Sequence, residues 1–249
     1  MISVDTVYQT VLALANKEQR GYITPQEFNL HAEQAQMSIF EQYFYDINQF
    51  KRIPGNNHNY ADAIDNLDEK ISIFIDETTA DVDTNGTINL SDIYRFYRLG
   101  TVKVDYSGAD NNFVLVEELG PGDKERYEAG PLTKYSRKRP VFQRHGAGGS
   151  QMLQIFPHPD LNLLNNLTPT VSVRYIYKPL SPKWTYIVIN DKALYNHGAT
   201  DRVDFSLHSA DQTELVVKIL QLAGVTIKDY NLTQVAAQEE AKNIQQEKR

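Results

Sequence analysis

Apolar residues recur at helical spacing in the first part of the chain. The first predicted helix begins after its cap residue, Ser3, and ends near Asn16. Its buried stripe is formed by Val4, Val7, Val11 and Leu12. These positions are three or four residues apart, which places them on one face of a helix.

The strongest local signal is the segment Thr24–Glu27. This segment has the pattern of a capping box, with Thr24 at the N-cap and Glu27 bonding back to the cap. Pro25 occupies the first helical position, where proline is favoured. The apolar stripe of the helix that follows consists of Phe28, Ala32, Ala35, Ile39, Tyr43, Phe44 and Ile47. A third helix is predicted from Tyr60, Ile64 and Leu67. We therefore expect residues 1–70 to form a helical region.

From about Ile71 the apolar pattern changes to a period of two, which is typical of strands. The alternating residues are Val102, Val104 and Tyr106, then Val171, Val173, Tyr175 and Tyr177, then Trp184, Tyr186 and Val188. Phe113–Val116 and Met152–Phe156 predict further strands, and glycine-rich turns such as Gly146–Gly149 separate them. We expect residues 71–208 to form one antiparallel β-rich domain.

Helical spacing returns at Ser209. Residues 209–229 are predicted to contain a helix that packs on the body and stops at Gly224. Its buried face consists of Leu215, Val216, Ile219, Leu220 and Ala223. The expected fold class is therefore α+β, with an N-terminal helical region, a central antiparallel β-rich domain, a C-terminal helix and an extended helical tail.

Residues 230–249 are helix-prone but almost entirely polar. A helix with so little to bury is not stable alone in water. We expect this tail to leave the globular body and to dock on a neighbouring subunit or on a portal protein. The residues that we expect to dock are Tyr230, Leu232, Val235 and Ala236. The alternative is a frayed, solvated tail.

The composition narrows the classes of function. The chain has 249 residues, of which 41% are hydrophobic and 23% are charged, as is usual for a globular protein. Its net charge of −7 gives it no general attraction for nucleic acid. The absence of cysteine excludes a disulfide framework, a thiolate metal site and a cysteine nucleophile. We also expect no signal peptide and no membrane span, because basic leaders and long apolar runs are missing.

One segment fits a calcium-binding pattern. Asp81–Asp92 places oxygen ligands at positions one, three, five and twelve of an EF-hand-like loop, with Gly86 at position six. The other interpretation is a turn at Asn85-Gly86 followed by a strand. We favour the turn, because the preceding run Ile71–Ile75 is β-branched and aromatic, whereas an EF-hand needs a helix there. A calcium-binding module with a β-rich domain remains the alternative function.

The only basic cluster in the sequence consists of Lys134, Arg137, Lys138 and Arg139. We interpret it as a solvated loop before a strand at Val141, but in a ring-shaped assembly it would be a candidate for contacting DNA in a channel. The six histidines show no metal-ligand spacing, and no motif for a catalytic nucleophile or a phosphate cradle occurs. A glycan hydrolase would need a separated carboxylate pair, and the sequence singles out none. We expect no catalytic residue, no metal and no cofactor.

The order of segments resembles the neck and tail ring proteins of crAss-like and related short-tailed bacteriophages, which are adaptors between portal and tail. The most specific part is Asn16–Asn29, which leads into a helix ending in Phe40–Phe44. Gly86–Tyr94 is similar to a strand motif of that family, although its proline is absent and Ile93 precedes the tyrosine. Arg174–Trp184 resembles the family's strand and Pro-x-x-Pro-x-Trp turn, and Glu214–Val225 its last helix before the tail.

The resemblance implies a non-enzymatic virion structural protein, made in the cytoplasm of the bacterial host. It implies a homo-oligomeric ring, twelvefold to match a portal, that contacts the portal protein and neighbouring tail or ring proteins. Double-stranded DNA would pass through the ring without sequence-specific binding. The aromatic content agrees, since 15 tyrosines and 10 phenylalanines suit subunit contacts. A head-to-tail contact that closes on itself gives such a ring.

Overall fold

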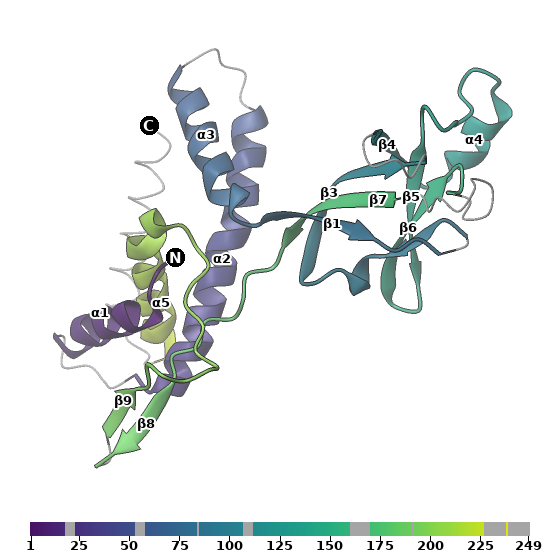
Figure 1. Cartoon of the computed structure of the whole chain (residues 1–249). Coiled ribbons are helices and arrows are strands. Elements are labelled where there is room, and N and C mark those ends of the chain that lie inside the picture. Colours follow the sequence, from purple (N-terminus) through teal and green to yellow (C-terminus); the bar gives the residue numbers. More distant parts are fainter. Residues whose placement is uncertain are drawn as a thin grey trace. The chain divides into compact units, whose positions relative to one another are not determined.

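The computed structural model describes residues 1–17, 23–52, 58–83, 85–106, 112–159, 170–190, 192–226 and 238. The chain forms two compact units, and its class is α+β, as expected. The first unit combines Met1–Ile73 with Pro179–Arg249, and the second consists of Phe74–Lys178 (Figure 1). In sequence, the second unit is therefore inserted into the first.

The first unit is mainly helical. Its elements are α1 (Val4–Lys17), α2 (Pro25–Arg52), α3 (His58–Ser72), a hairpin of β8 (Tyr186–Ile189) and β9 (Lys192–Tyr195), the 3₁₀ turn η2 (Ser209–Asp211) and α5 (Gln212–Thr226). The predicted capping box is confirmed. The Thr24 amide donates to Glu27 Oε2 at 3.0 Å, and the Glu27 amide donates to Thr24 Oγ1 at 3.3 Å. These bonds satisfy amides that the first turn of α2 leaves without helical partners.

The helices of the first unit pack through the stripes that the sequence predicts. α2 packs against α3 and α5, and α1 packs against α5. The predicted residues Phe28, Ala32 and Ile39 of α2 are fully buried, as are Leu215 and Ile219 of α5. A buried ion pair also links α3 to η2, since Lys70 Nζ lies 2.7 Å from Asp211 Oδ1. The Tyr43 hydroxyl of α2 donates to the same carboxylate.

The second unit is a seven-stranded sheet in the order β1-β7-β3-β4-β5-β6-β2. The strands are β1 (Ile75–Ala80), β2 (Thr87–Asn89), β3 (Phe96–Asp105), β4 (Val114–Leu119), β5 (Val141–Ala147), β6 (Ser150–Phe156) and β7 (Thr170–Tyr177), with η1 (Leu90–Asp92) after β2 and α4 (Lys124–Ala129) after β4 (Figure 1). All pairs are antiparallel except β4 with β5, which is parallel. The strands curl around one core that includes Ile88, Val102, Val104, Leu153, Ile155, Val171 and Val173.

The β-rich region has different boundaries from those expected. We expected residues 71–208 in one domain, but residues 179–208 group with the helices. The buried Gln36 of α2 explains why, because its amide nitrogen donates to the Leu180 carbonyl at 2.7 Å and its oxygen accepts from the Ser206 amide at 3.0 Å. Phe205 and Leu207 of this segment are buried. Side-chain contacts with helices, which a strand pattern does not reveal, assign the segment to the first unit.

Two local expectations were wrong. Ile71 and Ser72 are the last residues of α3, and the strand begins only at Ile75. Gly224 does not stop the last helix, since α5 continues to Thr226. A glycine inside a helix costs only about 1 kcal/mol relative to alanine, and packing of the buried α5 face offsets such a cost. The predicted boundaries of 209–229 and 230–249 cannot be compared further, because residues 227–237 and 239–249 lie outside the described residues.

Candidate assembly surface

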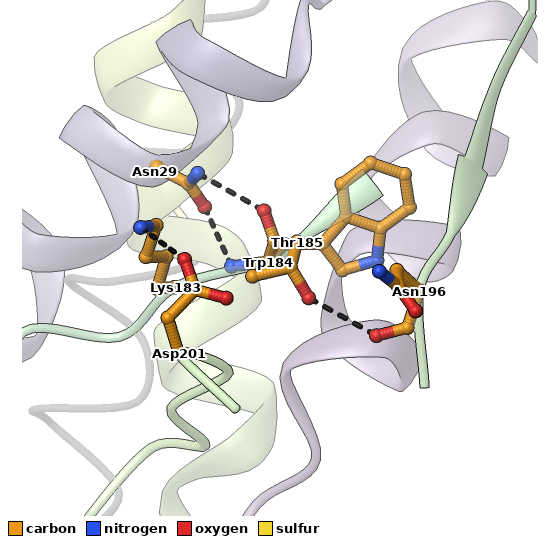
Figure 2. A network of polar contacts seen from close by, with 6 residues as sticks. All are labelled: Asn29, Lys183, Trp184, Thr185, Asn196 and Asp201. Carbon is orange, nitrogen blue, oxygen red and sulfur yellow. Dashed lines mark hydrogen bonds and ion pairs between the residues drawn. The ribbon is translucent and has the colours of Figure 1, made fainter. Parts of the chain in front are cut away.

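Trp184 anchors the hairpin β8–β9 to the helical unit. The side chain of Asn29 on α2 brackets its backbone: the Trp184 amide donates to Asn29 Oδ1 at 2.8 Å, and Asn29 Nδ2 donates to the Trp184 carbonyl at 3.2 Å (Figure 2). The indole Nε1 of the buried Trp184 donates to Asp5 Oδ1 of α1 at 2.9 Å. Two helices therefore hold Trp184, which lies two residues before the start of β8.

The base of the hairpin is held by further polar contacts. The Thr185 hydroxyl donates to the Asn196 carbonyl at 3.1 Å (Figure 2). The Asn196 amide donates to the Thr185 carbonyl at 2.9 Å. Lys183 Nζ lies 2.6 Å from Asp201 Oδ2, and this hydrogen bond holds the pKa of Asp201 below its usual value. The strands are thus fixed at the end nearest the helices.

The two faces of the hairpin differ in what they contact. In the antiparallel register Tyr186 pairs with Tyr195, and both rings stack on Trp184, with ring centroids 5.8 and 5.7 Å away. The pair Val188–Ala193 continues this face toward the tip. The opposite face carries the pairs Ile187–Leu194 and Ile189–Lys192. We call the side chains of Ile187, Ile189, Lys192 and Leu194 the outer face.

The outer face leaves aliphatic side chains in contact with solvent. Ile187, Ile189 and Leu194 are 46%, 48% and 47% exposed. Within the described residues the two-stranded sheet of β8 and β9 has no further strand, so the outer edge of each strand lacks a ladder partner. A two-stranded hairpin is only marginally stable by itself, and adjoining exposed apolar residues are typical of an interaction site. Figure 1 shows the hairpin at the end of the unit where α2 begins, with its tip directed away from the helices.

The sequence pattern did not single out the outer face. The alternation Trp184, Tyr186, Val188 marks the opposite face, of which only Trp184 is buried. One feature of the sequence could have pointed to the outer face: Tyr186–Ile189 is a continuous apolar run. Such a run is expected of a strand that is covered on both sides. Trp184 covers Tyr186 and Tyr195 on one side, whereas Val188 nearer the tip and the outer face are exposed.

The predicted basic cluster lies in the second unit, in the loop before β5, as expected. Ser136 and Arg139 form an isolated antiparallel bridge, with the Arg139 amide donating to the Ser136 carbonyl at 2.9 Å. Arg137 and Lys138 therefore occupy the tip of a tight turn, and they and Lys134 and Arg139 are exposed. The Arg137 guanidinium lies 5.9 Å from the centroid of the Tyr106 ring. In the part of the chain that the structure describes, none of these cations has a carboxylate partner.

The candidate calcium loop joins two strands. β1 precedes it and β2 follows it, whereas helices flank an EF-hand loop. The Gly86 amide donates to the Asp83 carbonyl at 2.8 Å, and the Asp83 amide donates to the Thr87 carbonyl at 2.9 Å. Gly86 has a φ of +71°, and a Cβ there would lie 2.6 Å from His158 Nδ1. A tight turn thus explains the glycine. Among the described residues no group of three or more His, Asp or Glu side chains is arranged to hold a metal ion.

The predicted docking residues Tyr230, Leu232, Val235 and Ala236 lie outside the described residues. Beyond Thr226 the structure describes Gln238 alone, which is helical and exposed. No helix among the described segments is long and apolar enough to cross a membrane.

Fold and surface together define an α+β protein of two compact units that carries an exposed apolar hairpin face. A scan against protein-family models found no match, and a search of curated proteins found no significant match.

Proposed function

We propose that this chain is a non-enzymatic structural subunit that assembles with copies of itself into a ring. The ring belongs to the neck or tail of a bacteriophage, where it connects the portal to the tail and lets double-stranded DNA pass. The outer face of the β8–β9 hairpin carries the self-assembly part of this proposal. A rigidly anchored hairpin with three half-exposed aliphatic side chains gains stability when a second subunit covers it.

The phage context rests on the order of segments that resembles neck and tail ring proteins. From that resemblance come the twelvefold symmetry, the portal partner and the location in the virion. The basic turn supports the passage of DNA, because its lysine and arginine side chains are exposed and have no carboxylate partner among the described residues, and such groups contact phosphates. Such contacts carry no sequence information, which suits DNA that slides through a channel.

Mass measurement by light scattering after size exclusion, with negative-stain images of the same fractions, tests the proposal. We expect the full chain to form rings of defined mass at micromolar concentration. Replacing Ile187 and Ile189 with serine should shift the protein to monomers, because it removes aliphatic groups from the outer face.

Val188→Ser is the matched control, since Val188 lies on the same strand with 65% exposure but points to the opposite face. It should leave the oligomer intact. A wild-type chain that stays monomeric at all concentrations, with portal protein present or absent, would refute the proposed function.

A further inference from the structure

We propose that the outer face of the β8–β9 hairpin receives the C-terminal segment Tyr230–Glu240 of a neighbouring copy of this chain. This inference rests on the proposed self-assembly and adds the identity of the contact. The contact joins different surfaces of the two copies. It therefore repeats head to tail and closes into a ring when the rotation between copies allows.

The receiving surface is an apolar strip with one cation at its end. Ile187 and Leu194 face each other near the base of the hairpin, and Ile189 faces Lys192 nearer the tip. Lys192 is exposed, and no carboxylate among the described residues pairs with it. A segment that fits must therefore present aliphatic groups followed by a carboxylate.

The C-terminal segment has this order of groups. Leu232, Val235 and Ala236 lie at spacings of three and four residues, and Glu239 and Glu240 follow at the same spacing. Residues so spaced share one face of a helix. Gln238, which belongs to this stretch, is helical. The segment therefore offers an apolar strip that ends in carboxylates.

The dimensions of the two surfaces agree. The outer face extends over two residue steps of each strand, about 7 Å, and the strands are about 5 Å apart. A helix from Leu232 to Glu239 rises about 10 Å. When Leu232 lies over the pair Ile187–Leu194, the segment runs toward the tip and brings Glu239 or Glu240 to Lys192.

A symmetric contact between two hairpins fits less well. It would bury only the same few side chains from each copy, whereas stable interfaces bury about 1,200–2,000 Å² in total. It would also offer Lys192 no opposite charge, because the outer face carries no acidic side chain. The C-terminal segment supplies the opposite charge through Glu239 and Glu240.

Disulfide trapping tests the contact directly, because the chain has no cysteine of its own. One preparation carries Leu194→Cys and a second carries Val235→Cys, and the two are mixed, assembled and oxidised. We expect a disulfide-linked dimer of the two variants, since a disulfide forms only when the two Cα atoms approach within about 7 Å. Leu132→Cys, at a 90% exposed position of the second unit, replaces Leu194→Cys in the control mixture and should give no comparable product.

The other outcomes of the trapping experiment overturn the inference in distinguishable ways. A dimer from Leu194→Cys alone would indicate a hairpin–hairpin contact. A variant that carries both Leu194→Cys and Val235→Cys provides a further comparison. If it forms an internal disulfide as a monomer, and the mixture gives no cross-linked dimer, the segment docks on its own chain. Rings that assemble normally but give no cross-link would overturn this contact while leaving the proposed function standing.

Charge exchange provides a second, independent measurement. Lys192→Glu should weaken assembly about tenfold or more, measured as the concentration at which rings dissociate. Combining Lys192→Glu with Glu239→Lys and Glu240→Lys should recover most of the lost assembly strength, because opposite charges then meet again with their positions exchanged. Equal weakening in the single and the combined variants would overturn the pairing.

Discussion

Thr24 and Glu27 fix the start of α2 through reciprocal hydrogen bonds. Thr24→Ala removes the hydroxyl that accepts from the Glu27 amide, so we expect the free energy of unfolding to fall by about 0.5–2 kcal/mol. Chemical denaturation followed by helical circular dichroism measures this loss. Thr10→Ala is the matched control, since the Thr10 hydroxyl only donates to the Thr6 carbonyl within α1. A cap variant as stable as this control would contradict the prediction.

The capping box of Thr24 and Glu27 also makes part of the free energy of unfolding depend on pH. Hydrogen bonds from the Thr24 amide and hydroxyl hold the pKa of Glu27 below its usual value of 4.5. Because the folded pKa is lowered, this contribution is complete above the unfolded value near 4.5 and is lost as the pH falls through the folded pKa. We therefore expect the stability gap between wild type and Thr24→Ala to narrow below pH 4.5. Denaturation series at several pH values measure the gap, and a constant gap would contradict the linkage.

Among the elements, α2, α3 and η2 are joined by the carboxylate of Asp211, which is 3% exposed and paired with Lys70 and Tyr43. Lys70→Met leaves this carboxylate buried without its cation, so we expect a loss of about 3–5 kcal/mol in stability. Lys183→Met breaks an ion pair whose partners are 52% and 58% exposed, and it should change stability by about 0–1 kcal/mol. Calorimetry of both variants makes the comparison, and equal effects would contradict the role of burial.

The basic turn is an element whose contact with DNA can be tested by substitution. Replacing Lys134, Arg137, Lys138 and Arg139 with glutamine should weaken binding to duplex DNA and flatten its salt dependence, by about 0.9 in log–log slope for each lost phosphate contact. The matched control replaces Arg126 and Arg144, which pair with Asp123 and Glu118. Fluorescence anisotropy at several salt concentrations measures both variants. An unchanged slope would exclude the turn as a phosphate contact.

For the whole molecule, the C-terminal segment separates stability from assembly. Deleting Gln234–Arg249 should leave the melting temperature of the monomer nearly unchanged, because the stretch has little to bury in its own core. The same deletion should abolish ring formation, because it removes the groups proposed to cover the hairpin of the next copy. Calorimetry and light scattering measure the two effects. A truncated chain that still forms rings, or one that unfolds, would contradict the prediction.

The sequence alone determined the features that depend on neighbours along the chain. Thr24-Pro25-Gln26-Glu27 specified the start of α2, and periods of 3.6 and 2 specified most helices and strands, because both signals come from local backbone geometry. The fold class and the exposed loop carrying Arg137 followed from the same patterns.

Tertiary structure decided the grouping of elements and the surface proposed for assembly. Residues 179–208 join the helices because Gln36 and Asn29 bind their backbone, and hydrogen bonds between residues 144–170 positions apart leave no periodic trace in a sequence. The same holds for the outer face. Trp184 stacks against Tyr186 and Tyr195, which leaves Ile187 and Leu194 on the opposite face, and packing of the whole unit settles that choice.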